Sequence, residues 1–239
     1  MMKIDLHVHC LPASPCAAIQ PEELPGLYQK AGLDGLVLTN HVTRHLNGYS
    51  TDYGEQAEMY IETYRRAKTA GEAVGFTVIF GAEVKLERYE HHPEFLLYGM
   101  TEELMRLSHP LFEKTQGELF NFCCEHDILM IQAHPLRVEQ GYEPADLTLM
   151  HGLEGYNPNF PSQSRYREIV RLAKKAGLLL SAGSDCHRAG QEGSAWMVFQ
   201  QNVADPQSLR RALLEEKPVI YGRNGRIELG NETDDAYQE

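Results

Sequence analysis

Short apolar segments that are typical of buried strands alternate with longer helical patterns along almost the whole chain. The apolar segments predict strands at Lys3–His7, Gly35–Thr39, Thr77–Leu86, Phe95–Tyr98, Ile128–Gln132, Gly152–Tyr156 and Leu178–Ala182. The helical patterns predict helices at Pro21–Ala31, Gly54–Ala73, Pro110–His126, Gln163–Ala176 and Asp205–Glu215. Because strands that alternate with helices are usually joined by crossover connections, this order indicates parallel strands in an α/β fold.

Polar side chains that can bind metal ions stand at or just after the ends of five predicted strands. They are His7 and His9, Asn40 and His41, Glu83, His134, and Asp185 and His187. A barrel brings all such ends to one face, where barrel enzymes carry their sites, whereas an open sheet spreads them along an edge. We therefore favour a barrel, distorted or with fewer than eight strands, over a doubly wound sheet.

The chain has 239 residues, which is a common length for a single α/β barrel. No repeat, low-complexity block or linker divides the sequence. We expect one domain over residues 1–229. The last residues, 230–239, are polar and acidic, and we expect a disordered tail there.

Charge and cysteine usage narrow the classes of partner and compartment. The chain carries 22 basic and 34 acidic residues, a net charge of −12, so binding of long nucleic acid is not expected. The five cysteines are odd in number and form no Cys-x-x-Cys pair, which fits a reducing cytoplasm. The N-terminus lacks the apolar run of a signal peptide, and no segment has the roughly 20 apolar residues of a membrane helix. We expect a soluble cytoplasmic protein without membrane contact, and the sequence leaves its oligomeric state open.

Two pairs of candidate ligands have the i, i+2 spacing that places side chains on the same face of a strand. Asp5, His7 and His9 are expected to project together, and two imidazoles at this spacing can chelate one ion. Chance histidines at a strand end are the alternative. Asp185 and His187 repeat the spacing, and Gly183 before them permits a tight turn or a close backbone approach.

The single candidates each have an ordinary structural alternative. Glu83 follows an apolar run and suits a bridging metal ligand, or else a salt bridge to a basic residue. His41 is a ligand or a loop histidine, and Pro135 fixes the turn that presents His134. Arg137 is a candidate phosphate contact or a surface cation. Because burying such groups at five strand ends without partners costs several kcal/mol each, their joint occurrence favours a metal cluster.

These blocks together resemble the PHP family of metal-dependent phosphoesterases, named for polymerase and histidinol phosphatase. The matching blocks are Asp5-Leu6-His7-Val8-His9, Thr39-Asn40-His41, Gly81-Ala82-Glu83, Gln132-Ala133-His134-Pro135 and Gly183-Ser184-Asp185-Cys186-His187. They span most of the chain. The resemblance implies a distorted seven-stranded β/α barrel, in agreement with the strand-end argument.

The resemblance also implies two or three divalent transition-metal ions, with zinc, manganese and iron all suited to the donor set. It assigns one ion to His7, His9, Glu83 and Asp185, a second to Glu83 and His134, and a third to His41 and His187. The chain departs from the family pattern at two places. Many relatives have a ligand histidine in the strand after the glutamate block, where this chain reads Glu94-Phe95-Leu96-Leu97-Tyr98-Gly99, with His91 and His92 just upstream. Many also have an acid or histidine soon after the first block, where Cys16 is a poor match.

The function that the resemblance implies is hydrolysis of a small phosphomonoester by metal-activated hydroxide. Asp185, His187 and Arg137 are the candidate catalytic residues, although the general acid stays unassigned. Histidinol phosphate, a nucleotide, the 3′ or 5′ end of a short oligonucleotide and a sugar phosphate are all candidate substrates. The alternatives are hydrolysis of an amide or cyclic ester, and a metal-binding module without catalysis on the same barrel.

The other polar residues have an ordinary structural interpretation. We expect that His45, His109, His126 and His151 are not ligands. Asn157 at the end of another strand caps a turn or lines the pocket.

Overall fold

The computed structural model describes residues 1–44, 51–137, 144–159, 163–216 and 219–227. His45 and the predicted tail at residues 230–239 lie outside these ranges. The strands are β1 (Met2–Val8), β2 (Gly35–Leu38), β3 (His41–Val42), β4 (Thr77–Lys85), β5 (Glu94–Tyr98), β6 (Leu129–Gln132), β7 (Gly152–Tyr156), β8 (Leu179–Ala182), β9 (Ala195–Phe199), β10 (Val219–Gly222) and β11 (Gly225–Arg226). The α-helices are α1 (Leu24–Lys30), α2 (Tyr53–Val74), α3 (Glu102–Ser108), α4 (Gln116–Glu125), α5 (Gln163–Ala176) and α6 (Pro206–Glu215).

Seven of the predicted strands pair side by side and curl into a distorted barrel. Their order is β1-β2-β4-β5-β6-β7-β8, and the chain just after β8 returns to β1 through a parallel bridge between Val8 and Cys186. The His9 amide donates to the Cys186 carbonyl at 3.0 Å beside this bridge. We call this junction between β1 and the chain just after β8 the seam of the barrel. The prediction of a distorted seven-stranded α/β barrel is therefore confirmed.

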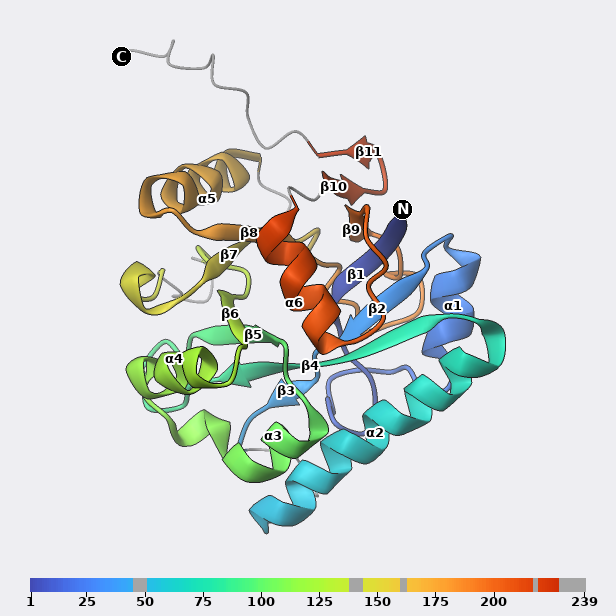
Figure 1. Cartoon of the computed structure of the whole chain (residues 1–239), viewed down its shortest axis with the longest axis horizontal. Coiled ribbons are helices and arrows are strands. Elements are labelled where there is room, and N and C mark those ends of the chain that lie inside the picture. The colour runs from blue at the N-terminus through green and yellow to red at the C-terminus, as the bar shows by residue number, and fades with distance from the viewer. Residues whose placement is uncertain (45–50, 138–143, 160–162, 217–218, 228–239) are drawn as a thin grey trace.

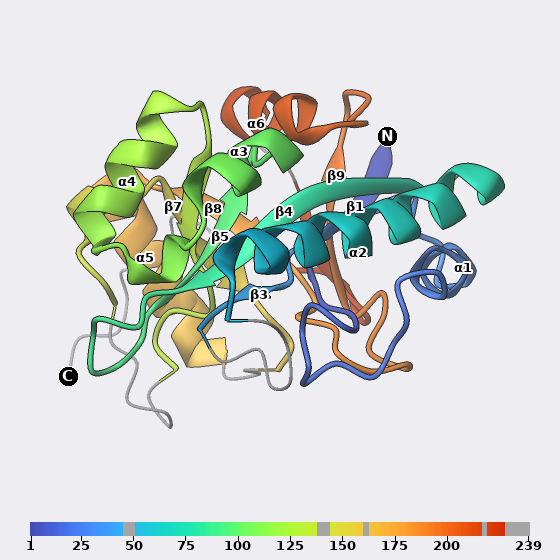
Figure 2. The same ribbon diagram turned by 90° about the horizontal axis from the view of Figure 1, so that it is seen from below.

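The two faces of this curled sheet bury separate hydrophobic clusters. On one face, Ile4, Ile79 and Leu96 pack with Leu209 and Leu213 of α6, which lies in front of the sheet in Figure 1. On the other face, side chains of β2, β4 and β6 pack against α1, α2, α4 and α5, which flank the sheet in Figures 1 and 2. In β4, Val78 and Phe80 pack in one cluster and Ile79 between them packs in the other, as the period of two in a strand requires.

The prediction that the strands are all parallel is wrong at β5. β5 runs antiparallel to both of its neighbours, β4 and β6. The segment Leu86 to Pro93 between β4 and β5 is too short for a crossover, because a parallel connection needs about a dozen residues or more. The two strands therefore form a hairpin, and this hairpin brings Glu94 beside Lys85.

The structure contains several elements that the apolar pattern did not predict, both after the barrel strands and between them. β9 pairs antiparallel with the first half of β1, and β10 and β11 extend the sheet outward from β9. The short strand β3 pairs with the end of β4, and α3 precedes the predicted helix Pro110–His126. The strand β9 carries a mixed pattern of buried and half-buried residues, which explains its weak signal.

The predicted helix Pro110–His126 is two elements, a 3-10 turn at Leu111–Glu113 and α4. α4 begins after Thr115, whose hydroxyl accepts a hydrogen bond from the Glu118 amide while the Glu118 carboxylate accepts one from the Thr115 amide. This capping box fixes a helix start at Gln116, because it satisfies two backbone amides that the helix itself leaves unpaired. Asp205 caps α6 in the same way, as predicted from Asp205-Pro206. Among the described residues, no helix is both long and apolar enough to cross a membrane.

A β-bulge in β1 corrects the prediction that Asp5, His7 and His9 project together. The pairing register with β2 shifts between Asp5 and Val8. Ile4 and Leu6 therefore pack in the cluster under α6, whereas Val8 packs in the cluster on the opposite face. The Asp5 carboxylate does not join the two imidazoles in a candidate metal group of the described residues, because it accepts hydrogen bonds from the Tyr28 hydroxyl of α1 and from the backbone amides of His7 and Ser184.

Gly183 packs directly on the backbone of β1 at the seam of the barrel. A Cβ atom at this position would lie 2.3 Å from the His7 Cβ and 2.5 Å from the His7 backbone nitrogen. The predicted close approach at Gly183 is confirmed, and any larger residue must displace the strand that carries His7.

We predict that Gly183→Ala lowers the free energy of unfolding by about 1–3 kcal/mol, because overpacking against backbone forces the seam apart. The measurement is urea denaturation followed by circular dichroism. Gly26→Ala in α1 is the matched control, since an added Cβ there meets no heavy atom within 4 Å. Equal stability of the two variants would contradict the close packing at the seam.

Candidate metal centre

The carboxylate of Glu83, at the end of β4, is surrounded by four imidazoles. Its Oε1 lies 3.3 Å from His7 Nε2 and 3.1 Å from His134 Nε2. Its Oε2 lies 3.4 Å from His9 Nε2 and 2.7 Å from His41 Nδ1. The two oxygens thus face different histidines, which is the arrangement that a carboxylate needs to bridge two neighbouring ions. The structure brings together the strand ends that the sequence singled out.

Asp185 completes the first group of candidate ligands, with His7, His9 and Glu83. Asp185 Oδ1 lies 3.5 Å from His7 Nε2 and 3.3 Å from His9 Nε2. The ligand atoms of His7, His9 and Glu83 all lie within 4.8 Å of one another, and those of His7, His134 and Asp185 do so as well. Asp185 has a φ of 52°, so its backbone lies in the left-handed region that non-glycine residues rarely adopt.

Glu94 occupies the place where the sequence showed no ligand histidine. The group formed by Glu83, Glu94 and His134 is buried, and Glu94 Oε2 lies 3.4 Å from His134 Nε2. His91 and His92, the suggested substitutes, are absent from every candidate group of the described residues. The signal for Glu94 was available, since an acid directly precedes the predicted apolar strand Phe95–Tyr98.

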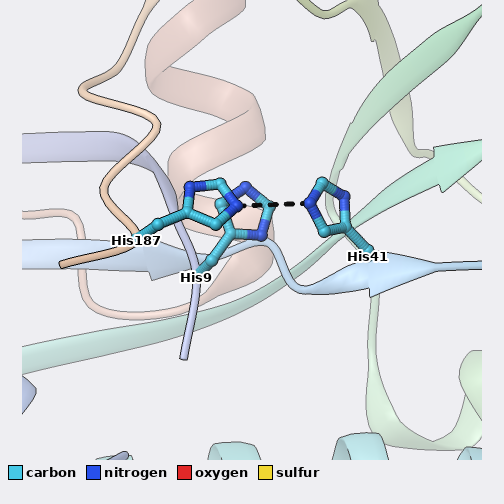
Figure 3. Close-up of side chains that lie close together, drawn as sticks. All are labelled: His9, His41 and His187. Carbon is cyan, nitrogen blue, oxygen red and sulfur yellow. Dashed lines mark hydrogen bonds between the residues drawn. The ribbon is translucent and has the colours of Figure 1, made fainter. Parts of the chain in front are cut away.

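A third group consists of histidines alone. His9, His41 and His187 place ring nitrogens within 4.8 Å of one another, and Figure 3 shows the three rings converging from separate segments. The His41 and His187 Nε2 atoms lie 3.3 Å apart. His187 Nδ1 also lies 3.4 Å from Asp185 Oδ1. The Cys16 thiol lies beside this group and forms hydrogen bonds with His187 and His41. Burial alone would raise the pKa of this thiol, but the two histidines lower it to about 6.

Glu154 is a buried residue of the site that the sequence reasoning missed. Its Oε1 accepts a hydrogen bond from His7 Nδ1 at 2.8 Å. Its Oε2 accepts from the His134 amide at 2.8 Å and from Asn157 Nδ2 at 3.1 Å. Glu154 thus fixes two candidate ligands at once, and a carboxylate inside the predicted strand Gly152–Tyr156 was the signal that pointed to it. Asn157 both caps a turn, through the Asn159 amide, and reaches Asp185 Oδ2 at 3.4 Å.

Ser14 orients the ring of His9. The Ser14 hydroxyl donates to Asn40 Oδ1 at 2.9 Å, so its oxygen accepts from His9 Nδ1 at 3.1 Å and from the His41 amide at 3.0 Å. Asn40 Oδ1 also accepts from the Cys10 amide at 2.8 Å. This arrangement places the proton of His9 on Nδ1 and leaves the Nε2 lone pair directed at the carboxylates.

Burial and neighbouring charges shift the protonation of the cluster strongly. Burial alone would raise the pKa of Glu83, but His7 and His41 hold that pKa well below its ordinary value. Burial opposes charge on His7 too, yet the carboxylates of Glu154 and Glu83 raise its pKa well above the ordinary value. Burial and the adjacent His41 keep the pKa of His9 well below its ordinary value. Positive charge on the imidazoles is therefore concentrated around the buried, negatively charged carboxylate of Glu83.

The donor set fits divalent transition-metal ions. His7 Nε2 and His9 Nε2 are buried and have no hydrogen-bond partner among the described residues. The other ring nitrogen of each is fixed by Glu154 or Ser14, which is the support that metal-binding histidines receive in proteins. Imidazole and carboxylate together suit zinc, manganese or iron. The residues present can hold the ions that the sequence predicts.

A cleft of about 630 Å³ opens beside the cluster, and its lining includes His41 and Glu94. Arg137, the predicted phosphate contact, is half-buried and does not line this cleft in the described part of the chain. Its phosphate contact stays a prediction. His109, His126 and His151 belong to no candidate metal group of the described residues, and their exclusion as ligands stays a prediction.

Family comparison agrees with the geometry. The PHP domain model matches residues 5–176, and the PHP-associated model matches residues 164–218. The chain therefore belongs to the PHP domain family, a family of metal-dependent phosphoesterases. The single-domain boundary at residue 229 stays a prediction. A search of curated proteins finds no match.

Solved structures with this fold carry several different activities in their names. A two-domain protein from Bacteroides vulgatus, containing a predicted PHP-like metal-dependent phosphoesterase, is 19% identical with a TM-score of 0.68. The match covers 95% of this chain and 66% of that protein, so this chain spans less than two thirds of it. The lesion-specific endonuclease of Pyrococcus furiosus is 13% identical with a TM-score of 0.63, covering 92% of this chain and 58% of that one. An amidohydrolase from Chromobacterium violaceum is 16% identical with a TM-score of 0.51, and the match covers 79% of this chain and 89% of that one. At these identities the likeness shows the fold alone.

We predict that Glu154→Gln weakens metal binding by about 10–100-fold, as loss of an outer hydrogen-bond partner does at other metal sites. Both oxygens of Glu154 accept hydrogen bonds, so the amide group of glutamine places a donor against a donor. The measurement is competition with a chelator of known affinity. The control is Glu168→Gln on the exposed face of α5, where no change is expected. Unchanged affinity in Glu154→Gln would show that the ligands do not depend on Glu154.

Proposed function

We propose that the protein is a phosphoric monoester hydrolase that uses two or three zinc, manganese or iron ions to cleave a small phosphorylated substrate. The observation that carries this proposal is the carboxylate of Glu83, whose two oxygens face two different pairs of histidines. A carboxylate of this kind could hold two neighbouring metal ions, and sites with two metal ions are suited to displacement at phosphorus. This arrangement is more specialised than a structural site requires, since structural zinc sites use four ligands around one ion.

The side chains divide into ligands and supports. His7, His9 and Glu83 would hold one ion together with Asp185, whose Oδ1 lies 3.3 Å from His9 Nε2, and Glu83, Glu94 and His134 would hold a second. His41 and His187 would contribute to a third. When bound, the ions lower the pKa of water and neutralise charge that develops on the phosphoryl oxygens.

The protein's own residues position the ligands and move protons. Glu154 and Ser14 hold the protons of His7 and His9 on Nδ1, so that both Nε2 atoms stay free for an ion. His187 is half-buried at the edge of the cluster, and its Nδ1 lies 3.0 Å from the Asp185 carbonyl oxygen. In a two-ion site, without an ion at His41 and His187, the Nε2 side of His187 is free to carry the proton that goes to the leaving oxygen, and Asp185 Oδ1 lies 3.4 Å from Nδ1 of the same ring. Arg137 is retained as a candidate phosphate contact.

The size of the cleft and the charge of the chain support a small substrate. A volume of about 630 Å³ lies within the range of small-molecule sites. The net charge of −12 disfavours long nucleic acid. All five cysteines are unpaired, which suits a cytoplasmic location in a reducing compartment.

The test is phosphate release from a panel of phosphomonoesters, with a cyclic amide beside them, after the protein is loaded with manganese, zinc or iron. We predict hydrolysis of phosphomonoesters and a loss of about 100-fold or more in Asp185→Asn, because a lost ion removes several kcal/mol of transition-state stabilisation.

Asp127→Asn is the matched control, since the Asp127 side chain is 70% exposed and pairs with Arg210 at 2.8 Å. Its activity should equal that of the wild type. Cleavage of the cyclic amide alone would assign the amide alternative, and no hydrolysis with any of the three metals would leave a binding module.

A further inference from the structure

The cleft extends past the metal ligands along the hairpin of β4 and β5. Glu83 and Lys85 are two residues apart on β4, so both project from the face that also carries Ile79. A strand rises about 3.4 Å per residue, which puts Lys85 roughly 7 Å beyond Glu83 along β4. Lys85 also lies directly opposite Glu94 in the hairpin, and both side chains line the cleft.

The other charges around Lys85 are already paired. The guanidinium of Arg44 lies 3.4 Å from Glu87 and 3.3 Å from Glu113. Glu87 also accepts hydrogen bonds from the Thr43 hydroxyl and the Arg44 amide. Glu94 is directed at His134, at 3.4 Å.

Lys85 itself has no ion pair or side-chain hydrogen bond with any described residue, although it is half-buried in the cleft wall. A half-buried ammonium group attracts an anion that enters the cleft more strongly than a fully exposed one does, because partial burial weakens the screening by water. The reacting phosphoryl group belongs beside Glu83, and the cleft has room beyond it for the rest of the substrate.

We propose that Lys85 binds an anionic group, a carboxylate or a second phosphate, on the leaving part of the substrate. The preferred substrates are then phosphomonoesters that carry two anionic groups, and Lys85 determines this specificity. The inference deepens the proposed phosphomonoesterase function and rests on it.

The test compares phenyl phosphate with 4-carboxyphenyl phosphate, which differ only in one carboxylate. The manganese-loaded wild type should prefer the carboxylated ester in kcat/KM, mainly through a lower KM. Lys85→Gln should reduce this preference about tenfold, which is the change in affinity expected from the loss of one hydrogen bond to a charged group. Lys85→Arg should keep most of the preference, because the charge remains.

Lys30→Gln in the last turn of α1 is the control for a lost positive charge, since Lys30 is exposed and does not line the cleft. It should keep the wild-type preference. If Lys85→Gln slows both esters equally, Lys85 contacts the reacting phosphoryl group and the specificity proposal is wrong, while the phosphatase proposal stands.

A binding measurement separates this inference from the proposed activity. Calorimetry with phenylphosphonate and 4-carboxyphenylphosphonate, which the protein cannot hydrolyse, should show the same difference between wild type and Lys85→Gln. Absence of ester hydrolysis would refute the phosphatase proposal, whereas equal binding of the two phosphonates by the wild type would refute the role of Lys85.

Discussion

The convergence of four histidines on the carboxylate of Glu83 is the interaction on which the rest of the site depends. The imidazoles come from β1, β3 and the loop after β6, so they meet only when the barrel closes. Burying this carboxylate without cations would be costly, and its low pKa shows how strongly the surrounding imidazoles compensate. The seam between β1 and the loop after β8 is equally necessary, since it brings Asp185 to the same point. Gly183 is required there because only a residue without a side chain lets the two backbones approach.

The sequence predicted the strands that carry ligands because they are short, apolar and end in histidine or acid. It predicted β7 with its observed bounds and placed His7, His9, Glu83, His134 and Asp185 at one end of the barrel. It missed the antiparallel direction of β5, because strand direction follows from the length of the connection rather than from the apolar pattern. It also misplaced Asp5, because a bulge is a property of pairing between two strands and leaves no period in one of them.

The supporting residues were harder to find than the ligands. Glu154 is identified by what its two oxygens accept, and those donors belong to His7 and His134, which are far away in the sequence. Glu94 becomes a candidate ligand only when the hairpin places it beside His134. Substrate choice depends on residues outside the ligand blocks in the same way. Structures of this fold are named as an endonuclease, an amidohydrolase and a phosphoesterase, so the fold alone does not determine the substrate.

Counting bound metal by native mass spectrometry is the most direct test of whether Glu83 would hold neighbouring ions. We predict two or three ions in the manganese-loaded wild type. Glu83→Gln should lose at least two ions together, because both oxygens of Glu83 would serve as ligands. Glu94→Gln should lose only one, since Glu94 belongs to a single candidate group. A wild-type protein with one ion, or a Glu83→Gln variant that keeps the full number, would contradict the account.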